Sequence, residues 1–410
     1  MSFVSTCGRI RPLYRDIILS RASPVCRYVS AIPRPKSPSA SETSVGFIKP
    51  RQLIPIPSPL ICQRQAHTLE SPSSTAIPEP YSPPTTGILS RLPSSWVPYA
   101  ELMRLDKPAG TLYLLFPCLF STLLAAPLAT PMASPLSVLG TSVLFFAGAL
   151  IMRGAGCSIN DLWDRNLDPQ VTRTRLRPIA RGALTPFRAF AWTGVQLLTG
   201  LGVLLQFPTV CLYYGIPSLA LVATYPLAKR VTYYPQFMLG LTFSWGAVMG
   251  FPALGVDLLA ADAGAIRAAA ALLYTSNVAW TVLYDMIYAH MDIQDDVKAG
   301  IKSIALKHDV DSKKVLTGLA VVQISLLAGA GIATGAGPAF FIGSCGGAAL
   351  TLGYMIKRVD LKSVKNCWWW FVNGCWITGG AISLGLGVDY LIQYLDNDTT
   401  PSGNEAGVDS

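Results

Sequence analysis

Charged residues are scarce in this 410-residue chain, where they make up 13% of the sequence against 51% for hydrophobic residues. A soluble globular protein carries roughly 25% charged residues, so nearly half of the usual charge is missing. This deficit argues against a soluble protein and predicts a membrane protein. The net charge of +9 does not predict nucleic-acid binding, because the basic residues form no groove-tracking patch with interleaved aromatic side chains.

The chain also lacks the cysteine spacing of a disulfide framework or a zinc site. Its nine cysteines are odd in number, and they form no CxxC pair and no cluster with histidine. Most of those after residue 100 lie in apolar runs, where a free thiol behaves as a small hydrophobic side chain. Structural disulfides and structural zinc are therefore not expected.

Acidic residues are nearly missing from the first 66 residues, which hold only Asp16 and Glu42 beside ten Lys/Arg. The segment is rich in Ser and Pro and has no uninterrupted apolar core of the kind found in secretory signals. This composition predicts an organelle transit peptide over residues 1–66, and a disordered basic tail is the alternative. The Pro-rich stretch 67–96 predicts a disordered linker.

Apolar runs of membrane-spanning length recur over residues 97–393. They are continuously apolar rather than alternating, which favours transmembrane helices over a β-barrel. We place nine spans, near 108–128, 136–156, 189–206, 209–227, 236–256, 266–289, 314–334, 337–356 and 368–392. The predicted fold is an all-α membrane protein over 97–393, followed by an acidic disordered tail over 394–410.

The basic residues of the loops are distributed unevenly. The loops after spans two, four, six and eight carry seventeen Lys/Arg between Arg165 and Lys365, whereas the other loops and the C-terminal tail carry only Arg267. Alternation puts the first set of loops and the N-terminal segment on one side of the membrane. By the positive-inside bias this side is the cytoplasm or, in a mitochondrion, the matrix.

The segment after the second span, beginning Cys157-Ser-Ile-Asn-Asp-Leu-Trp-Asp, is unusually acidic. If the helix continues here, Asn160, Asp164 and Asp168 recur every four residues, whereas Asp161, Asp164 and Asp168 are spaced i, i+3 and i+7. Either set lies on one helical face. Pro169 disfavours helical geometry at Asp168, so the helix is expected to end there. Like charges at this spacing repel one another, which is costly unless a cation neutralises them.

A second acidic cluster follows the sixth span. Asp285, Asp292 and Asp296 are spaced i, i+7 and i+11, again on one helical face, with Asp295 adjacent. Clustered carboxylates suit Mg²⁺ bound together with substrate phosphates better than a zinc site. The alternative is that these acids pair with arginines in solvated loops. Two matched clusters leaving the membrane on the same side favour metal binding.

Four sequence blocks resemble the UbiA superfamily of intramembrane prenyltransferases. The run from Asn160 to Asp168 followed by Val171–Pro178 is similar to its first signature, and Tyr284–Ser303 is similar to its second. Two further blocks, Arg104–Gly110 and Tyr225–Gln236, resemble the 4-hydroxybenzoate polyprenyltransferase branch, which acts in mitochondrial ubiquinone biosynthesis. The resemblance covers about residues 97–393 and implies nine transmembrane helices around a central cavity, in agreement with the count above.

The resemblance implies prenyl transfer from an all-trans polyprenyl diphosphate to the 3-position of 4-hydroxybenzoate in the mitochondrial inner membrane, with the catalytic loops facing the matrix. Other ubiquinone-biosynthesis proteins are candidate partners, and nucleic acid is not one. By motif position, one Mg²⁺ would be held by Asn160, Asp164 and Asp168, and a second by Asp292 and Asp296. Secondary acidic candidates are Asp161, Asp285 and Asp295. The candidate diphosphate clamps are Arg173, Arg177, Lys229, Arg230 and Lys302.

Arg153 lies inside the second span, seven residues before Asn160 and on the same helical face. An intramembrane guanidinium needs a partner and is usually functional. The carboxylate of the aromatic acid is the natural candidate, and the resemblance points the same way. The alternative is a structural ion pair with an acid of a neighbouring helix.

Other activities are also consistent with parts of the pattern. A meroterpenoid-type aromatic prenyltransferase would share both acidic motifs, but the transit-like N-terminus argues against it. Haem farnesyltransferase fits less well, because the second motif and its Gly-Ile-Lys-Ser end follow the hydroxybenzoate branch. A transporter of anionic solutes could use Arg153, but metal-binding acids do not suit transport of an anion alone.

Overall fold

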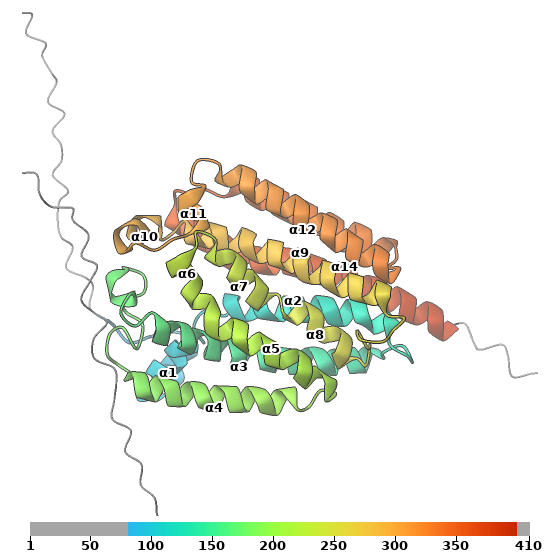
Figure 1. The fold of residues 1–410 in the computed structure, drawn as a ribbon, viewed down its shortest axis with the longest axis horizontal. Helices are drawn as coiled ribbons and strands as arrows, with labels where there is room; N and C mark the ends of the chain where they lie inside the picture. The colour runs from blue at the N-terminus through green and yellow to red at the C-terminus, as the bar shows by residue number, and fades with distance from the viewer. Residues whose placement is uncertain (1–80, 400–410) are drawn as a thin grey trace, which may run out of the picture. The chain divides into compact units, whose positions relative to one another are not determined.

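The computed structural model describes residues 81–399, apart from the side chains of Lys229 and Ala299. Within this range the chain is helical and contains no strand (Figure 1). The predicted transit peptide over 1–66 lies outside the described residues, as do residues 67–80 of the predicted linker and residues 400–410 of the predicted acidic tail. The last helix continues to Thr399, past the domain end expected at residue 393.

Fourteen α-helices make up the described part of the chain. They are α1 (Val97–Leu102), α2 (Ala109–Ala125), α3 (Pro135–Trp163), α4 (Pro186–Leu204), α5 (Val210–Thr224), α6 (Ala228–Val231), α7 (Pro235–Phe243), α8 (Gly246–Ala253), α9 (Gly264–Ala289), α10 (Ile293–Ala299), α11 (Ile304–Lys307), α12 (Ser312–Thr334), α13 (Gly347–Arg358) and α14 (Val364–Thr399). Short 3₁₀ turns are η1 (Leu89–Arg91), η2 (Ala126–Leu128), η3 (Asp168–Gln170) and η4 (Tyr225–Leu227), and η5 (Phe340–Gly346) is a π-helical stretch that runs into α13.

Helices occupy all nine predicted span positions, but not every one is a single apolar helix. Within residues 81–399, six helical segments are long and apolar enough to cross a membrane. The helices α4 and α9 have 19 and 26 residues but are not among these six. The predicted span 236–256 is divided into α7 and α8, which have 9 and 8 residues. The all-helical membrane class is confirmed, whereas the count of nine spans is not.

Local sequence signals account for the starts of α3 and α4. The Ser134 hydroxyl accepts a hydrogen bond from the Ser137 backbone N–H, and Pro135 takes the first helical position. At α4, Thr185 and Pro186 form the same combination. A hydroxyl cap satisfies a free N–H of the first turn, and proline there sacrifices no helical hydrogen bond.

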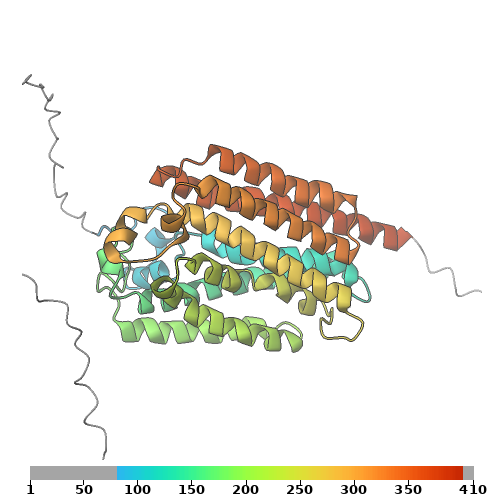
Figure 2. The ribbon, with the colours of Figure 1, turned by 45° about the horizontal axis from the view of Figure 1, so that its top comes forward.

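The helix α2 lies at the centre of the bundle, where it packs against α3, α8 and α14 (Figure 2). Of its most apolar stretch 67% is buried, against 17% for α3 and 11% for α5. Close approach to α8 requires Gly250, because a Cβ at this position would lie 2.3 Å from the Thr122 backbone nitrogen. The helix α2 therefore connects α3, α8 and α14 through the core of the bundle.

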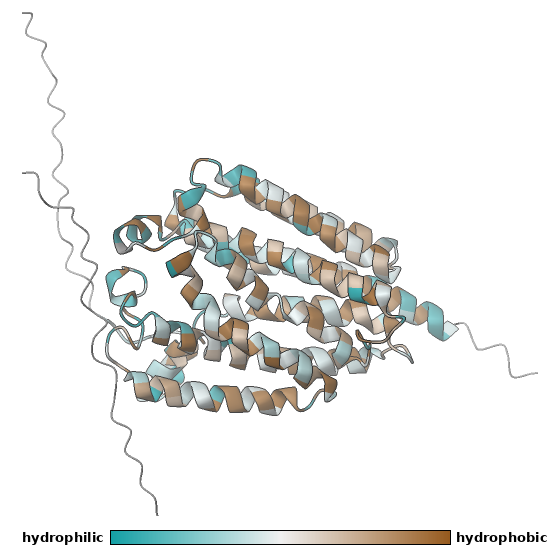
Figure 3. Ribbon diagram, viewed as in Figure 1, coloured by the Kyte–Doolittle hydropathy of each residue, from teal (hydrophilic) through white to brown (hydrophobic). Residues whose placement is uncertain are grey.

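The outer helix faces are apolar (Figure 3). Large hydrophobic side chains such as Leu136, Phe187, Leu198 and Tyr213 are 70–79% exposed. Exposed apolar surface of this extent is unfavourable in water but matches the hydrocarbon core of a bilayer. These faces therefore contact lipid.

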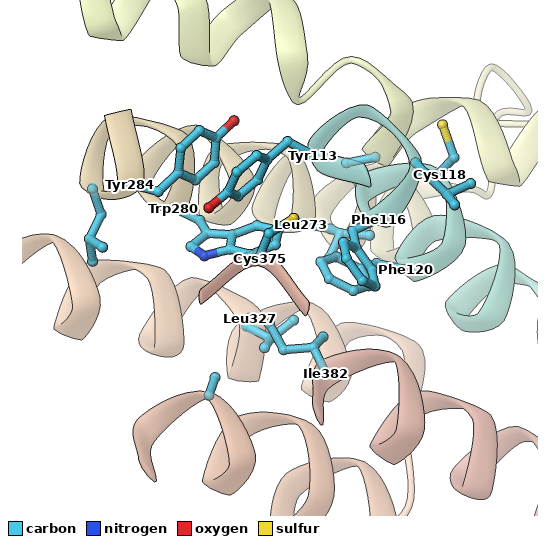
Figure 4. Close-up of a cluster of buried hydrophobic side chains, with 14 of the residues drawn as sticks. Tyr113, Phe116, Cys118, Phe120, Leu273, Trp280, Tyr284, Leu327, Cys375 and Ile382 are labelled. Atoms are coloured by element: carbon cyan, nitrogen blue, oxygen red, sulfur yellow. The ribbon is translucent and has the colours of Figure 1, made fainter. Parts of the chain in front are cut away.

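An aromatic cluster fills the core between α2, α9 and α14 (Figure 4). The rings of Tyr113 and Tyr284 are stacked with centroids 3.6 Å apart, and Trp280 meets both rings edge-on. Phe116 and Phe120 continue the cluster along α2. These rings give the interior a rigid, water-excluding wall.

Four loops that the sequence places on one side of the membrane meet at one end of the bundle, where α6, α10 and α11 lie (Figure 1). The Thr172 N–H donates to Asp295, which joins the loops after α3 and α9. Lys302 donates to the Val231 carbonyl, and Lys313 donates to the Lys357 carbonyl, so the loops after α6 and α13 join the same end. The four loops therefore lie at the same end of the helical bundle.

Candidate active site

A pocket of about 230 Å³ opens at this end of the bundle. Both acidic motifs contribute to its walls, together with basic and aromatic side chains. Its charged and amide-bearing lining residues are Asn160, Asp168, Arg173, Arg177, Gln236, Asp285, Asp292, Asp296 and Lys302. Eight of the fourteen predicted site residues therefore lie around one cavity.

The first acidic motif follows the end of α3. The helix ends at Trp163, and Asp164 is its C-terminal cap, so the helix stops five residues before the expected end at Asp168. A 3₁₀ turn then carries Asp168 into the pocket. With its amide nitrogen facing Asp164, Asn160 donates to that carboxylate at 3.3 Å. The side chain of Asp164 is 1% exposed, and it lies behind the pocket wall rather than in it.

The spacing of the second motif predicted one continuous helix, and this prediction is wrong. The helix α9 ends at Ala289, and Asp292 is the residue before α10, whose first turn contains Asp296. The chain turn nevertheless brings Asp285, Asp292 and Asp296 to the same pocket. A break between two helices replaces the single helical face and leads to the same convergence.

Arg173 joins the two motifs. Its Nη2 lies 2.6 Å from Asp292 Oδ2, and its Nε lies 2.9 Å from Asp292 Oδ1. Its Nη1 donates to the Tyr288 hydroxyl, and its guanidinium lies 4.8 Å from the centre of the Tyr288 ring. A two-point pair with a carboxylate fixes the orientation of a guanidinium. Arg173 thus lies directly over the second acidic motif.

Arg177 holds the first motif in a similar way. Its Nη1 is 3.0 Å from both oxygens of Asp168 and 3.0 Å from Asp161 Oδ1. Asp161 has no exposed surface and does not reach the pocket. Asp161, Asp168 and Asp292 are therefore paired with arginines, but inside the folded structure and not in solvated loops.

The remaining predicted cations differ in their distance from the pocket. Lys302 lines it, and its ammonium lies 5.4 Å from the centre of the Tyr233 ring. Arg230 lies outside the lining; it donates to the Trp163 carbonyl at 2.8 Å and is 3.9 Å from Asp164. The side chain of Lys229 lies outside the described atoms.

Arg153 lies deeper in α3, behind the inner end of the pocket. Its Nε is buried without a hydrogen-bond partner in the described part of the chain, and Phe243 lies 5.8 Å from its guanidinium. Among the phenols that interact with it electrostatically, Tyr225 and Tyr288 also line the pocket. No ion pair to Arg153 is found among residues 81–399, which leaves its charge available to a bound anion.

Burial raises the pKa of Asp168 to about 6. Arg177 opposes this effect, because a nearby guanidinium favours the ionised carboxylate, whereas Asp161 and Asp164 raise the pKa further. The charge of Asp168 therefore changes at a pH not far below neutrality.

The lining suits a divalent metal bound together with a diphosphate. No three His, Cys, Asp or Glu side chains of residues 81–399 form a ready-made metal-ligand set. Mg²⁺, however, is usually held by one or two carboxylates with substrate phosphates and waters, not by an all-protein cage. The pocket provides four carboxylates, those of Asp168, Asp285, Asp292 and Asp296, beside cations able to bind phosphate oxygens. The donor set therefore fits Mg²⁺.

Sequence reasoning assigned no role to three residues that the structure places at or beside this site. Tyr288 contacts Arg173, and Tyr225 lines the pocket. Arg104 donates to both oxygens of Asp161 at 2.8 Å. Tyr288 lies three residues after Asp285 and four before Asp292, so helical spacing could have identified it. Nothing in the local sequence shows the contact of Arg104, which spans 57 residues.

The fold and the pocket are those of a helical membrane protein with an acid- and arginine-lined site at one end. Residues 114–378 match the UbiA prenyltransferase family. The chain is 46% identical over 307 residues to "4-hydroxybenzoate polyprenyltransferase, mitochondrial" of Saccharomyces cerevisiae, covering 74% of this chain and 79% of the relative. It is 39% identical to the protein of the same name from Homo sapiens, covering 82% and 88%. The chain belongs to the UbiA prenyltransferase family.

Solved structures agree with this fold. The apo structure of a UbiA homolog from Aeropyrum pernix K1 matches with a TM-score of 0.53 at 22% identity, covering 69% of this chain and 98% of that one. A UbiA homolog from Archaeoglobus fulgidus bound to GPP and Mg²⁺ matches with a TM-score of 0.53 at 17% identity, covering 72% and 99%. At these identities the likeness shows a common fold.

Proposed function

We propose that the protein transfers an all-trans polyprenyl group from polyprenyl diphosphate to the 3-position of 4-hydroxybenzoate in ubiquinone biosynthesis, with release of diphosphate. Relatives of 39–46% identity over most of the chain are named for this activity. The observation that carries the proposal is the single pocket in which two acidic motifs, separated by more than 110 residues of chain, face each other. A diphosphate with its metal ions is a ligand of this size and charge.

The acids of the pocket would hold two Mg²⁺ ions. We assign one to Asn160, Asp164 and Asp168, and the other to Asp292 and Asp296, with Asp285 as a further pocket carboxylate. A relative of the same fold was solved with GPP and Mg²⁺, which supports this choice of metal. Bound there, the ions would offset negative charge on the departing diphosphate. Movement of Asp164 into the pocket is part of this assignment, because its side chain now lies behind the wall.

The cations of the pocket bind the diphosphate oxygens. Arg173 and Arg177 offer planar, two-point donors and Lys302 a compact charge. Arg173 exchanges its pair with Asp292 for the incoming phosphate, which frees the carboxylate at the same time. Lys229 and Arg230 lie on the α6 segment beside the pocket and supply further positive charge. Together with metal ions that offset the four pocket carboxylates, these cations favour an anionic substrate.

Prenyl transfer then needs a dry and electron-rich surrounding. The allylic C–O bond breaks with its electron pair leaving on the diphosphate, and the ring carbon ortho to the phenol bonds to the allylic carbon. The ring proton then passes to the released diphosphate, which restores aromaticity. The rings of Tyr225 and Tyr288 line the pocket and can stabilise the cation through their π-faces. Arg153, behind these rings, binds the carboxylate of 4-hydroxybenzoate and sets which ring carbon faces the donor.

The protein is a multi-pass membrane protein, as its apolar helices require, and its relatives are mitochondrial by name. We place it in the mitochondrial inner membrane with the pocket facing the matrix. The basic loops at the pocket end support this orientation through the positive-inside bias. Residues 1–66 would act as the transit peptide. Protease accessibility in mitoplasts tests the orientation, because cleavage at the pocket end from the outer side contradicts it.

A prenylation assay in lipid vesicles tests the function. The full chain is supplied with polyprenyl diphosphate and radiolabelled 4-hydroxybenzoate, with Mg²⁺ or with EDTA. We expect prenylated product only with Mg²⁺ and a loss of roughly 100-fold or more in Asp292→Asn, because a substituted metal ligand removes charge stabilisation from the departing group. Product in EDTA would contradict the metal assignment. A preference for another aromatic acceptor would favour a meroterpenoid-type activity.

A further inference from the structure

We infer that Asp161 is a positioning residue, which together with Arg104 holds Arg177 against Asp168, and that it binds neither metal nor substrate. Sequence spacing groups Asp161 with the acids of the first motif, since it is adjacent to Asn160 and three residues before Asp164. The structure separates it from them. This inference rests on the proposed function only for the identity of the ligands in the pocket.

The carboxylate of Asp161 has no free face. The side chain is 0% exposed, and both of its oxygens lie 2.8 Å from Arg104 Nη2. Oδ1 also accepts from Arg177 Nη1 at 3.0 Å. Arg177 lines the pocket, whereas Asp161 does not. A ligand in the pocket would thus meet Arg177 before it could reach Asp161.

The four side chains form a chain of alternating charge. Arg104 contacts Asp161, Asp161 contacts Arg177, and Arg177 contacts both oxygens of Asp168. Two positive and two negative charges balance one another. Removal of Asp161 leaves the largely buried Arg104 without its carboxylate partner and leaves Arg177 with Asp168 alone.

The backbone at Arg104 supports a specific role for this arginine. Its φ is 60°, and it is the sole residue other than glycine with a positive φ in the described range 81–399. An L-residue with a long side chain adopts this conformation at a cost in free energy, so the surroundings must hold it there. Arg104 Nη1 also donates to the Glu101 carbonyl at 2.8 Å. The turn between α1 and α2 therefore presents the guanidinium to Asp161 in a set direction.

The consequence for the pocket is the orientation of Arg177. One guanidinium nitrogen is shared between a buried anchor, Asp161, and a pocket carboxylate, Asp168. Without the anchor, Arg177 is free to follow other anions, and Asp168 loses a fixed neighbour. Substitution of a residue that orients a metal ligand without binding the metal typically weakens metal binding by about 10–100-fold.

A double-substitution experiment separates positioning from ligation. The full chain is purified in detergent as wild type, Asp161→Asn, Arg177→Gln and the double variant of these two residues. Mg²⁺ affinity is measured by titration with inorganic pyrophosphate present, beside thermal unfolding and product formation. We expect about tenfold weaker Mg²⁺ binding in Asp161→Asn. The double variant should bind Mg²⁺ within about threefold of Arg177→Gln, because a residue that acts only through Arg177 has no further effect once Arg177 is replaced.

Asp164 supplies the matched control, because it is an acid of the same motif that the proposed function assigns to the metal. Asp164→Asn should weaken Mg²⁺ binding further in the Arg177→Gln background, as expected for a metal ligand. Wild-type Mg²⁺ affinity in Asp161→Asn, or a double variant that binds Mg²⁺ about tenfold more weakly than Arg177→Gln, would overturn the inference. If Asp161→Asn does not fold, the comparison of the double variant with Arg177→Gln decides alone, and a further loss of about tenfold or more there overturns the inference. Absence of product from wild type with this binding pattern intact would instead count against the proposed function.

Discussion

Arg173 and Asp292 form a two-point ion pair, with Nη2–Oδ2 and Nε–Oδ1 distances of 2.6 and 2.9 Å, between loops that follow two different helices. The pair joins the two acidic motifs at one point. The Tyr288 hydroxyl accepts from the same guanidinium. The geometry of the pocket therefore depends on an arginine that can serve the protein carboxylate or an incoming phosphate, but not both fully.

We predict that Arg173→Lys raises the KM for polyprenyl diphosphate by about tenfold, because an ammonium keeps the charge but loses the planar two-point contact. The expected change in kcat is smaller. Initial rates at varied diphosphate concentration in vesicles measure both constants. Arg188→Lys, on the exposed start of α4, is the control for the same exchange. An equal effect of the two substitutions would show that only net charge matters.

The pKa of Asp168, raised to about 6 by burial, predicts that Mg²⁺ binding is pH-dependent. A carboxylate must lose its proton to bind a metal, so affinity should be about tenfold weaker at pH 5 than at pH 8. The pKa in the folded state lies above the ordinary 3.8, so protonation of Asp168 stabilises the fold as the pH falls. The weaker Mg²⁺ binding at low pH is therefore not a result of unfolding at this residue. Titration calorimetry at several pH values tests this, and pH-independent affinity from 5 to 8 would refute it.

Gly110 makes room for Arg153. A Cβ at Gly110 would lie 2.2 Å from Arg153 Nε, so Gly110→Ala must displace the guanidinium. If Arg153 binds the carboxylate of the aromatic acid, kcat/KM for 4-hydroxybenzoate should fall by about tenfold or more, because displaced binding groups misalign the substrate. The KM for polyprenyl diphosphate should change little. Gly140→Ala in α3, where nothing lies within 4 Å, is the control, and equal kinetics of the two variants would contradict the assignment.

Asp389 predicts a stability effect remote from the pocket. Its carboxylate is buried and accepts from the Gly337 and Phe340 N–H groups at 3.1 and 3.2 Å and from Gln393 at 2.8 Å. Asp389→Ala should cost about 2–3 kcal/mol, because it leaves buried donors unpaired. Thermal unfolding in detergent measures the loss, and Asp396→Ala on the exposed end of α14 is the control. Unchanged Mg²⁺ affinity is expected, and a change in affinity would show coupling to the pocket.

Much of the architecture follows from the sequence alone, for identifiable reasons. A long apolar run must form a helix in a bilayer, and this requirement locates α2, α12 and the start of α3 to within a few residues. The end of α3 and both ends of α14 extend beyond the predicted spans. The span at 236–256 was less well predicted, because apolarity does not show that the chain breaks near Ser244 between α7 and α8. The π-helical stretch at Phe340 had no signal in the pattern either.

The sequence by itself determined the candidate residues for the chemistry, because buried charge is costly in a membrane and clustered acids need cations. It therefore identified both acidic motifs and Arg153. Only the tertiary structure decided which of these residues line the pocket and which arginine each acid contacts. The contacts of Arg104 and Arg173 with Asp161 and Asp292 cross 57 and 119 residues of chain, and local periodicity carries no information over such separations. Spacing could group Asp161 with its neighbours, but packing turns it away from the pocket.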